Sequence, residues 1–183
     1  MDLVWTQSNG GPLLVLNEEA LPLWQGVTNE GDPTDPATHY GQACEVQGPA
    51  GLVDLGSGQA GLVLGDDTSL PAAVLGVESG FAILRTYHHP TQPVPVDELL
   101  AAGKGQPSWE GGFQVGPSGR LLLFDSALAG AEVDTPPDPR WESRLPTLRF
   151  SCSPGRYRVV SYYVVPGVYE HEAWVHGVRP VAS

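Results

Sequence analysis

The segment RYRVVSYYVVPGVYEHEAWVHGV, residues 156–178, carries the clearest fold signal in the chain. It is rich in Val and Tyr, which favour the pleated, half-buried surface of a β-strand. Pro166-Gly167 places Pro and Gly at the central positions of a type II turn. The segment therefore predicts two strands, over residues 156–165 and 169–178, that are joined as a hairpin.

Short apolar runs bounded by Gly and Pro extend this pattern along the rest of the chain. They predict further strands over 147–152, 120–124, 81–87, 60–64, 51–55 and 13–16. Helical signals are brief and cover 18–24, 38–45 and 97–102, the last beginning at Val96 or Asp97 and ending at Gly103. Residues 26–38 and 130–143 are predicted loops. We expect one α+β domain over residues 1–183, mainly antiparallel β-sheet with a few short helices, and with one sheet face packed and the other solvated.

Charge and hydropathy exclude several classes of protein. The 183 residues hold 9 Lys and Arg against 21 Asp and Glu, a net charge of −12. Such a chain would repel nucleic acid and attract a basic partner. It has no apolar run of the roughly 18 residues needed to cross a membrane, and its first residues lack the features of a signal peptide. These features predict a cytoplasmic protein with no membrane and no nucleic-acid partner, in which Cys44 and Cys152 are reduced and buried.

Two motifs resemble known binding patterns without meeting their requirements. Residues 56–61 match GxGxxG, but the next residues are strand-like and cannot supply the helix that a dinucleotide site needs. His171-Glu172 and His176 resemble HExxH with one residue too many, and in a strand the two imidazoles would point to opposite faces. We therefore predict no cofactor and no metal site.

The sequence is also compatible with two other functions. The first is an enzyme that uses Asp125 or Ser126 together with a histidine, although no GxSxG motif surrounds Ser126. The candidate histidines are His88, His89, His171 and His176. A β-rich module for small molecules or carbohydrates would need its aromatic side chains on one face. The aromatic residues available are Tyr157, Tyr162, Tyr163, Tyr169 and Trp174, of which alternation separates Tyr162 from Tyr163.

An ordered series of weak motifs runs along most of the chain. It comprises Trp5 with Asn9-Gly10-Gly11-Pro12-Leu13-Leu14-Val15, Trp24-x-Gly26, Tyr40-x-x-Ala43-Cys44, Ala60-Gly61-Leu62-Val63-Leu64-Gly65-Asp66, Phe124-Asp125-Ser126-Ala127-x-x-Gly130 and Pro154-Gly155-x-Tyr157. Taken in order, this series resembles the bacterial immunity protein 21 family. The chain departs from the family pattern at His39, where an acid is expected, and at Thr86-Tyr87, where a Trp is expected after Arg85.

The resemblance implies a non-catalytic immunity protein of a polymorphic toxin system. Such a protein binds and neutralises a cognate toxin in the cytoplasm of the producing cell, and no catalytic residue is implied. The shared motifs imply scaffold positions rather than contacts. These positions are Trp5, Gly10, Gly11, Pro12, Trp24, Gly26, Tyr40, Cys44, Phe124, Asp125, Ser126, Gly155 and Tyr157.

The acidic charge suggests where a toxin would bind. A basic nuclease toxin would be attracted to the acidic loops over residues 28–37, 65–68 and 130–142. A Trp in the last of these loops is also a common type of interface anchor. The predicted toxin contacts are Glu30, Asp32, Asp35, Asp66, Asp67, Glu132, Asp134, Asp138 and Trp141.

Overall fold

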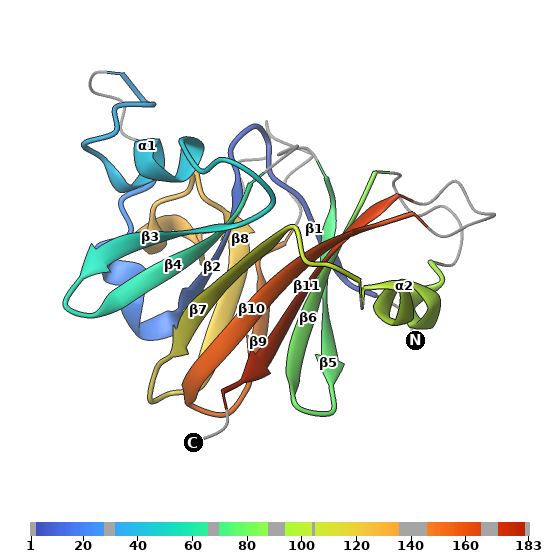
Figure 1. The fold of residues 1–183 in the computed structure, drawn as a ribbon. Helices are drawn as coiled ribbons and strands as arrows, with labels where there is room; N and C mark the ends of the chain where they lie inside the picture. The colour runs from blue at the N-terminus through green and yellow to red at the C-terminus, as the bar shows by residue number, and fades with distance from the viewer. Residues whose placement is uncertain are drawn as a thin grey trace.

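Two antiparallel β-sheets pack face to face in the computed structural model of the chain (Figure 1). The structure describes residues 3–27, 32–65, 70–87, 94–103, 105–135, 146–165 and 172–181. The prediction of a mainly antiparallel β domain with a few short helices is confirmed. None of the described helices is long and apolar enough to cross a membrane.

The larger sheet, sheet A, has six strands in the order β1-β5-β6-β11-β10-β7. Its strands are β1 (Trp5–Thr6), β5 (Ala72–Val77), β6 (Gly80–Thr86), β7 (Trp109–Val115), β10 (Gly155–Val164) and β11 (Ala173–Pro180). The predicted pairing of the two C-terminal strands is observed, with Val159 opposite Val178. Their predicted turn, Pro166-Gly167, lies outside the described residues. β11 begins later than expected and lies in the middle of the sheet.

The smaller sheet, sheet B, has five strands in the order β3-β4-β2-β8-β9. Its strands are β2 (Leu13–Asn17), β3 (Gly51–Gly56), β4 (Gln59–Leu64), β8 (Arg120–Asp125) and β9 (Leu148–Ser151). Each corresponds to a predicted strand, and β3 pairs with β4 across the glycine-rich turn as expected. The glycine motif is therefore part of a hairpin.

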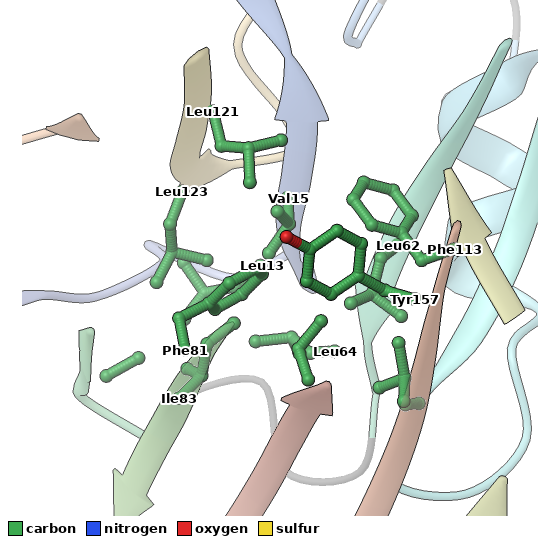
Figure 2. Close-up of a cluster of buried hydrophobic side chains, with 14 of the residues drawn as sticks. Leu13, Val15, Leu62, Leu64, Phe81, Ile83, Phe113, Leu121, Leu123 and Tyr157 are labelled. Carbon is green, nitrogen blue, oxygen red and sulfur yellow. The ribbon is translucent and has the colours of Figure 1, made fainter. Parts of the chain in front are cut away.

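The main core lies between the two sheets, where alternate residues of each strand meet (Figure 2). Sheet B contributes leucines and a valine, and sheet A contributes mostly aromatic and β-branched side chains. The contacting residues include Leu13, Val15, Leu62, Leu64, Leu121 and Leu123 from sheet B and Phe81, Ile83, Phe113 and Tyr157 from sheet A. Burying each such side chain stabilises the fold by about 1.5–3 kcal/mol.

The outer face of sheet B is also buried, which corrects the expectation of one solvated face. Leu14, Leu16 and Phe124 point outward and pack against three short helical segments. These are η1 (Glu18–Leu23) and η2 (Gly130–Glu132), which are 3₁₀ helices, and α1 (His39–Cys44). The continuous run Leu13-Leu14-Val15-Leu16 explains the difference, because a strand without alternation is buried on both faces.

The outer face of sheet A is covered only in part. α2 (Val96–Ala102) matches the predicted helix and packs Leu99 against Leu84 and Val175. It lies at the β5–β6–β11 side of the sheet (Figure 1). Over β7 and the neighbouring half of β10, no helix of the described residues covers the sheet.

The two cysteines are free thiols, as predicted, but each is half-buried rather than fully buried. Cys44 packs against the cluster on the outer face of sheet B, whereas Cys152 packs against the core between the sheets. The two thiols therefore lie on opposite faces of sheet B. Each fills the edge of a cluster instead of its centre.

Candidate functional site

Three helical segments form one continuous layer over the outer face of sheet B. Trp24, at the end of η1, stacks on His39 of α1 with ring centroids 6.1 Å apart. The Gly130 amide of η2 donates to the Trp24 carbonyl at 2.8 Å. We use the name acidic layer for η1, α1 and η2 together with the turn before α1 and the residues that follow η2 as far as residue 134. Its carboxylates are Glu18, Glu19, Asp32, Asp35, Glu132 and Asp134.

Asp32 and Asp35 hold the turn that leads into α1. Asp32 accepts hydrogen bonds from the amide and the hydroxyl of Thr34, at 2.9 and 2.7 Å. These bonds, first that of the hydroxyl and then that of the amide, lower the pKa of Asp32. Asp35 accepts from the Ala37 amide at 2.9 Å. Both side chains are exposed, and neither makes an ion pair within the described part of the chain, so their charge is available to a partner.

Glu132 and Asp134 are also tied into the protein: Glu132 accepts a hydrogen bond at η2, and Asp134 makes an ion pair. Glu132 accepts from the Ala129 amide at 3.2 Å, which fixes the start of η2. Asp134 pairs with Arg149, and the same guanidinium contacts Glu18 at 2.8 Å. Arg120 also pairs with Glu18. The charge at this end of the layer is therefore partly neutralised.

The structure brings together two of the three predicted contact regions. The described parts of loops 28–37 and 130–142 both belong to the acidic layer, although about a hundred residues separate them in sequence. The remaining predicted contacts lie outside the described residues; they are Glu30, Asp66, Asp67, Asp138 and Trp141.

Many motif residues gather at one end of sheet B, beneath the acidic layer. The Trp24 indole donates to the Ser126 carbonyl at 2.9 Å, and Asp125 accepts from the Asn9 amide at 2.9 Å. Burial raises the pKa of the Tyr40 hydroxyl, and its hydrogen bond with the Cys44 thiol raises it further. A side chain at Gly11 would meet the Tyr40 hydroxyl at 2.8 Å, so a glycine is required there.

The other motif residues lie nearby or at strand ends. Gly10 and Pro12 flank Gly11 in the turn before β2, Gly26 follows η1, and Phe124 is buried in β8. Trp5 lies on the edge strand β1, and Gly155 and Tyr157 begin β10. The Tyr157 hydroxyl donates to the Ser153 carbonyl at 2.8 Å.

The described residues do not assemble the serine–histidine pair that an enzyme would need at Ser126. Ser126 is fully buried, and its hydroxyl has no hydrogen-bond partner. His176 instead contacts Ser161, with Nδ1 and Oγ 2.8 Å apart, and both residues are inaccessible to solvent. His88, His89 and His171 lie outside the described residues. Within the described ranges, no three His, Cys, Asp or Glu side chains could hold a metal ion.

The aromatic side chains near the C-terminal strands do not share one face. Tyr157 lies in the core between the sheets, Tyr162 packs on the outer face near α2, and Tyr163 is exposed on the side opposite to Tyr162. Trp174 is buried beside Tyr163, with ring centroids 5.1 Å apart. Tyr169 lies outside the described residues. Among the described aromatic residues of this set, Tyr162 therefore faces away from Tyr163 and Trp174.

Sequence reasoning missed the buried Ser161–His176 pair and a group of arginines on sheet A. Arg156, Arg158 and Arg179 lie on the outer face of β10 and β11, with Arg158 directly opposite Arg179. The alternation Arg-Tyr-Arg over residues 156–158 is a signal for two charges on one strand face. The pairing of β10 with β11, which adds the third charge, depends on register.

The fold and this surface define a β-sandwich domain with an acidic helical layer on one side. The family model for Immunity protein 21 matches residues 4–169, so the chain belongs to that family and the resemblance is confirmed. It is thus an immunity protein of a toxin system. Searches of curated proteins and of solved structures find no match.

Proposed function

We propose that this protein binds the toxin domain of its own polymorphic toxin system in the cytoplasm of the producing cell and neutralises it without catalysis. Membership of the Immunity protein 21 family carries the proposal. The Ser126 hydroxyl is buried and has no hydrogen-bond partner, which argues against Ser126 as a nucleophile, because a nucleophile needs both access and a base. An inhibitor of this kind acts by occupancy, so protection should be complete at one inhibitor per toxin.

We propose further that the acidic layer contacts the toxin and that the toxin domain is basic, as a nuclease that binds phosphates would be. The exposed, unpaired carboxylates of Asp32 and Asp35 support this assignment. Charges of one sign on one face steer a basic partner and increase the association rate. The surface charge thus selects for a partner of opposite sign.

The test measures binding of a catalytically inactivated toxin domain, encoded beside this gene, at increasing salt. A second assay measures the activity of the intact toxin domain with increasing amounts of this protein. Asp32→Asn with Asp35→Asn keeps side-chain acceptors for the turn and removes two charges. The matched control, Asp97→Asn with Glu98→Gln, removes two exposed charges from α2 on the other sheet. We expect the first pair to slow association by about tenfold at low salt and the control to change it little.

Three outcomes have distinct meanings. If the toxin binds tightly and neither double variant changes its binding, the acidic layer is not the contact surface, but the protein is still an inhibitor. A toxin that is bound but remains active would contradict neutralisation. No binding and no protection of cells that express the toxin would contradict the proposed function as a whole.

A further inference from the structure

The uncovered part of sheet A carries a concentration of positive charge. Arg156, Arg158 and Arg179 account for three of the nine Lys and Arg residues in a chain of net charge −12. Strand register places them together: Arg158 lies opposite Arg179 on one side and opposite Gly112 of β7 on the other. We call this surface, with Gly112 and Gly177, the arginine face.

The fold itself does not require these charges. Glu110 pairs with Arg158 through two contacts of 2.6 Å, and this bond lowers the pKa of the Glu110 carboxyl. Arg156 and Arg179 make no ion pair with any described residue. Like charges directly opposite each other on neighbouring strands destabilise a sheet. Two unpaired guanidiniums beside Arg158 therefore oppose stability and are available to an external anion.

The two glycines on this face are not explained by backbone geometry or packing. A Cβ at Gly112 would have the Tyr157 carbonyl oxygen as its nearest atom, at 3.9 Å, and one at Gly177 would have that of Val160, also at 3.9 Å. Neither glycine has a positive φ. Glycine in a strand weakens the sheet and often marks a bulge, a tight bend, or the close approach of a ligand or another backbone. The strand register is unbroken at both glycines, so neither marks a bulge. Both glycines leave the surface beside β10 open.

A pocket adjoins the arginines at the edge of α2. Its volume is about 170 Å³, and its wall is mostly apolar. A cavity of about 150 Å³ is enough for a benzene-sized group, so this pocket has room for one apolar side chain. Its lining includes Leu100, Val160, Tyr162, Gly177, Arg158 and Arg179.

We propose that the arginine face is a second docking surface for the toxin polypeptide and that it receives a segment carrying carboxylates. The carboxylates pair with Arg156 and Arg179, and a neighbouring apolar side chain enters the pocket beside α2. This inference rests on the proposed function, since it names a further contact of the same partner. The rest of the protein repels an acidic segment, so charge complementarity directs such a segment to this face.

The experiment uses the full chain and the inactivated toxin protein, with affinity measured by calorimetry. A Cβ at Gly177 would meet no atom closer than 3.9 Å, and Gly177 lines the pocket, so Gly177→Leu should leave the melting temperature near that of the wild type while affinity falls by at least about tenfold. Arg156→Gln with Arg179→Gln should weaken binding by about tenfold. The control, Arg120→Gln with Arg149→Gln, also removes two positive charges, but from guanidiniums that pair with Glu18 on the other sheet. It frees acidic charge there and should therefore bind at least as tightly as the wild type.

The outcomes separate this inference from the function on which it rests. If the wild-type protein binds and neutralises the toxin but either the pocket variant or the arginine pair binds as the wild type does, the assignment of this face is overturned and the function stands. If the wild-type protein neither binds nor protects, the proposed function fails first. Loss of affinity in both variants, with folding intact and no loss of affinity in the control, supports the arginine face.

Discussion

His176 illustrates what burial does to a single ionisable side chain. Its imidazole is inaccessible to solvent, and burial, assisted by the nearby positive charge of Arg85, lowers its pKa well below the usual value of 6.5. The folded protein thus holds His176 neutral, whereas the unfolded chain takes up a proton below about pH 6.5. The free energy of unfolding should therefore decrease as the pH is lowered, by up to about 1.4 kcal/mol between about pH 7.5 and 5.5. Urea unfolding at the two pH values measures the loss.

A substitution isolates this effect from the other titrating groups. His176→Asn offers an amide to Ser161 and cannot take up a proton. We expect the variant to be less stable in the neutral range, because the smaller side chain fills less of the core, but to lose less stability on acidification. An equal loss in both proteins would show that other groups control the pH dependence.

Gly26 is required for two reasons that can be separated by mutation. Its φ of +66° favours glycine, and a Cβ there would lie 2.4 Å from the Ala129 nitrogen, where η1 contacts η2. Gly58 has a similar φ of +73°, but a Cβ added there would have no atom within 4 Å. Gly58→Ala should cost about 1 kcal/mol for the backbone alone, and Gly26→Ala should cost about 3 kcal/mol or more because the backbone must move. Equal costs in denaturant unfolding would contradict the close contact.

At the scale of single elements, a strong local sequence pattern is sufficient to predict a helix or strand, and a weak pattern is not. The valine-rich strands and the helix ending at Gly103 were predicted because their signals lie within about ten residues. The sequence does not predict β5 and β7, since AAVLGV contains two Ala and a Gly and WEGGFQV contains two Gly, residues of low strand propensity. These two segments become strands because neighbouring strands supply hydrogen bonds. The position of the two acidic loops on the same face of sheet B likewise depends on the pairing of β2 with β8, which no local pattern encodes.

The short helix α2 depends on one side chain for its position. With fewer than two turns, it has little stability of its own, and Leu99 is its fully buried residue. Leu99→Ala should destabilise the protein by about 2–5 kcal/mol. Leu23→Ala removes the same atoms from a side chain that is 37% exposed and should cost much less. Thermal unfolding of both variants tests this; similar melting temperatures would show that α2 is held by other contacts.

On the scale of the whole molecule, the sandwich separates its charges. The acidic layer covers one sheet, and the arginine face lies on the outer side of the other sheet. Composition predicted the net charge but not this division, because strand order and register determine which side chains share a face. A molecule charged in this way is oriented by the field of a charged partner before contact. Both proposed docking surfaces follow from this separation.

The last strand of the chain connects the two parts of sheet A. β11 lies between β6 and β10, and it follows the residues that the family model matches, 4–169. A chain that ends at Glu172 would lose this strand together with the buried side chains of Trp174, Val175 and Val178. Both neighbouring strands, β6 and β10, would then lose the backbone hydrogen bonds that β11 makes to them. We expect no cooperative unfolding transition by circular dichroism, and rapid cleavage by protease.

A chain that ends at Val181 retains all of β11 and should unfold as the full chain does. Adding a synthetic peptide of residues 172–181 to the shorter chain should restore part of the transition, because an isolated strand can bind in the gap between β6 and β10. A cooperative transition in the shorter chain without the peptide would contradict the central role of β11.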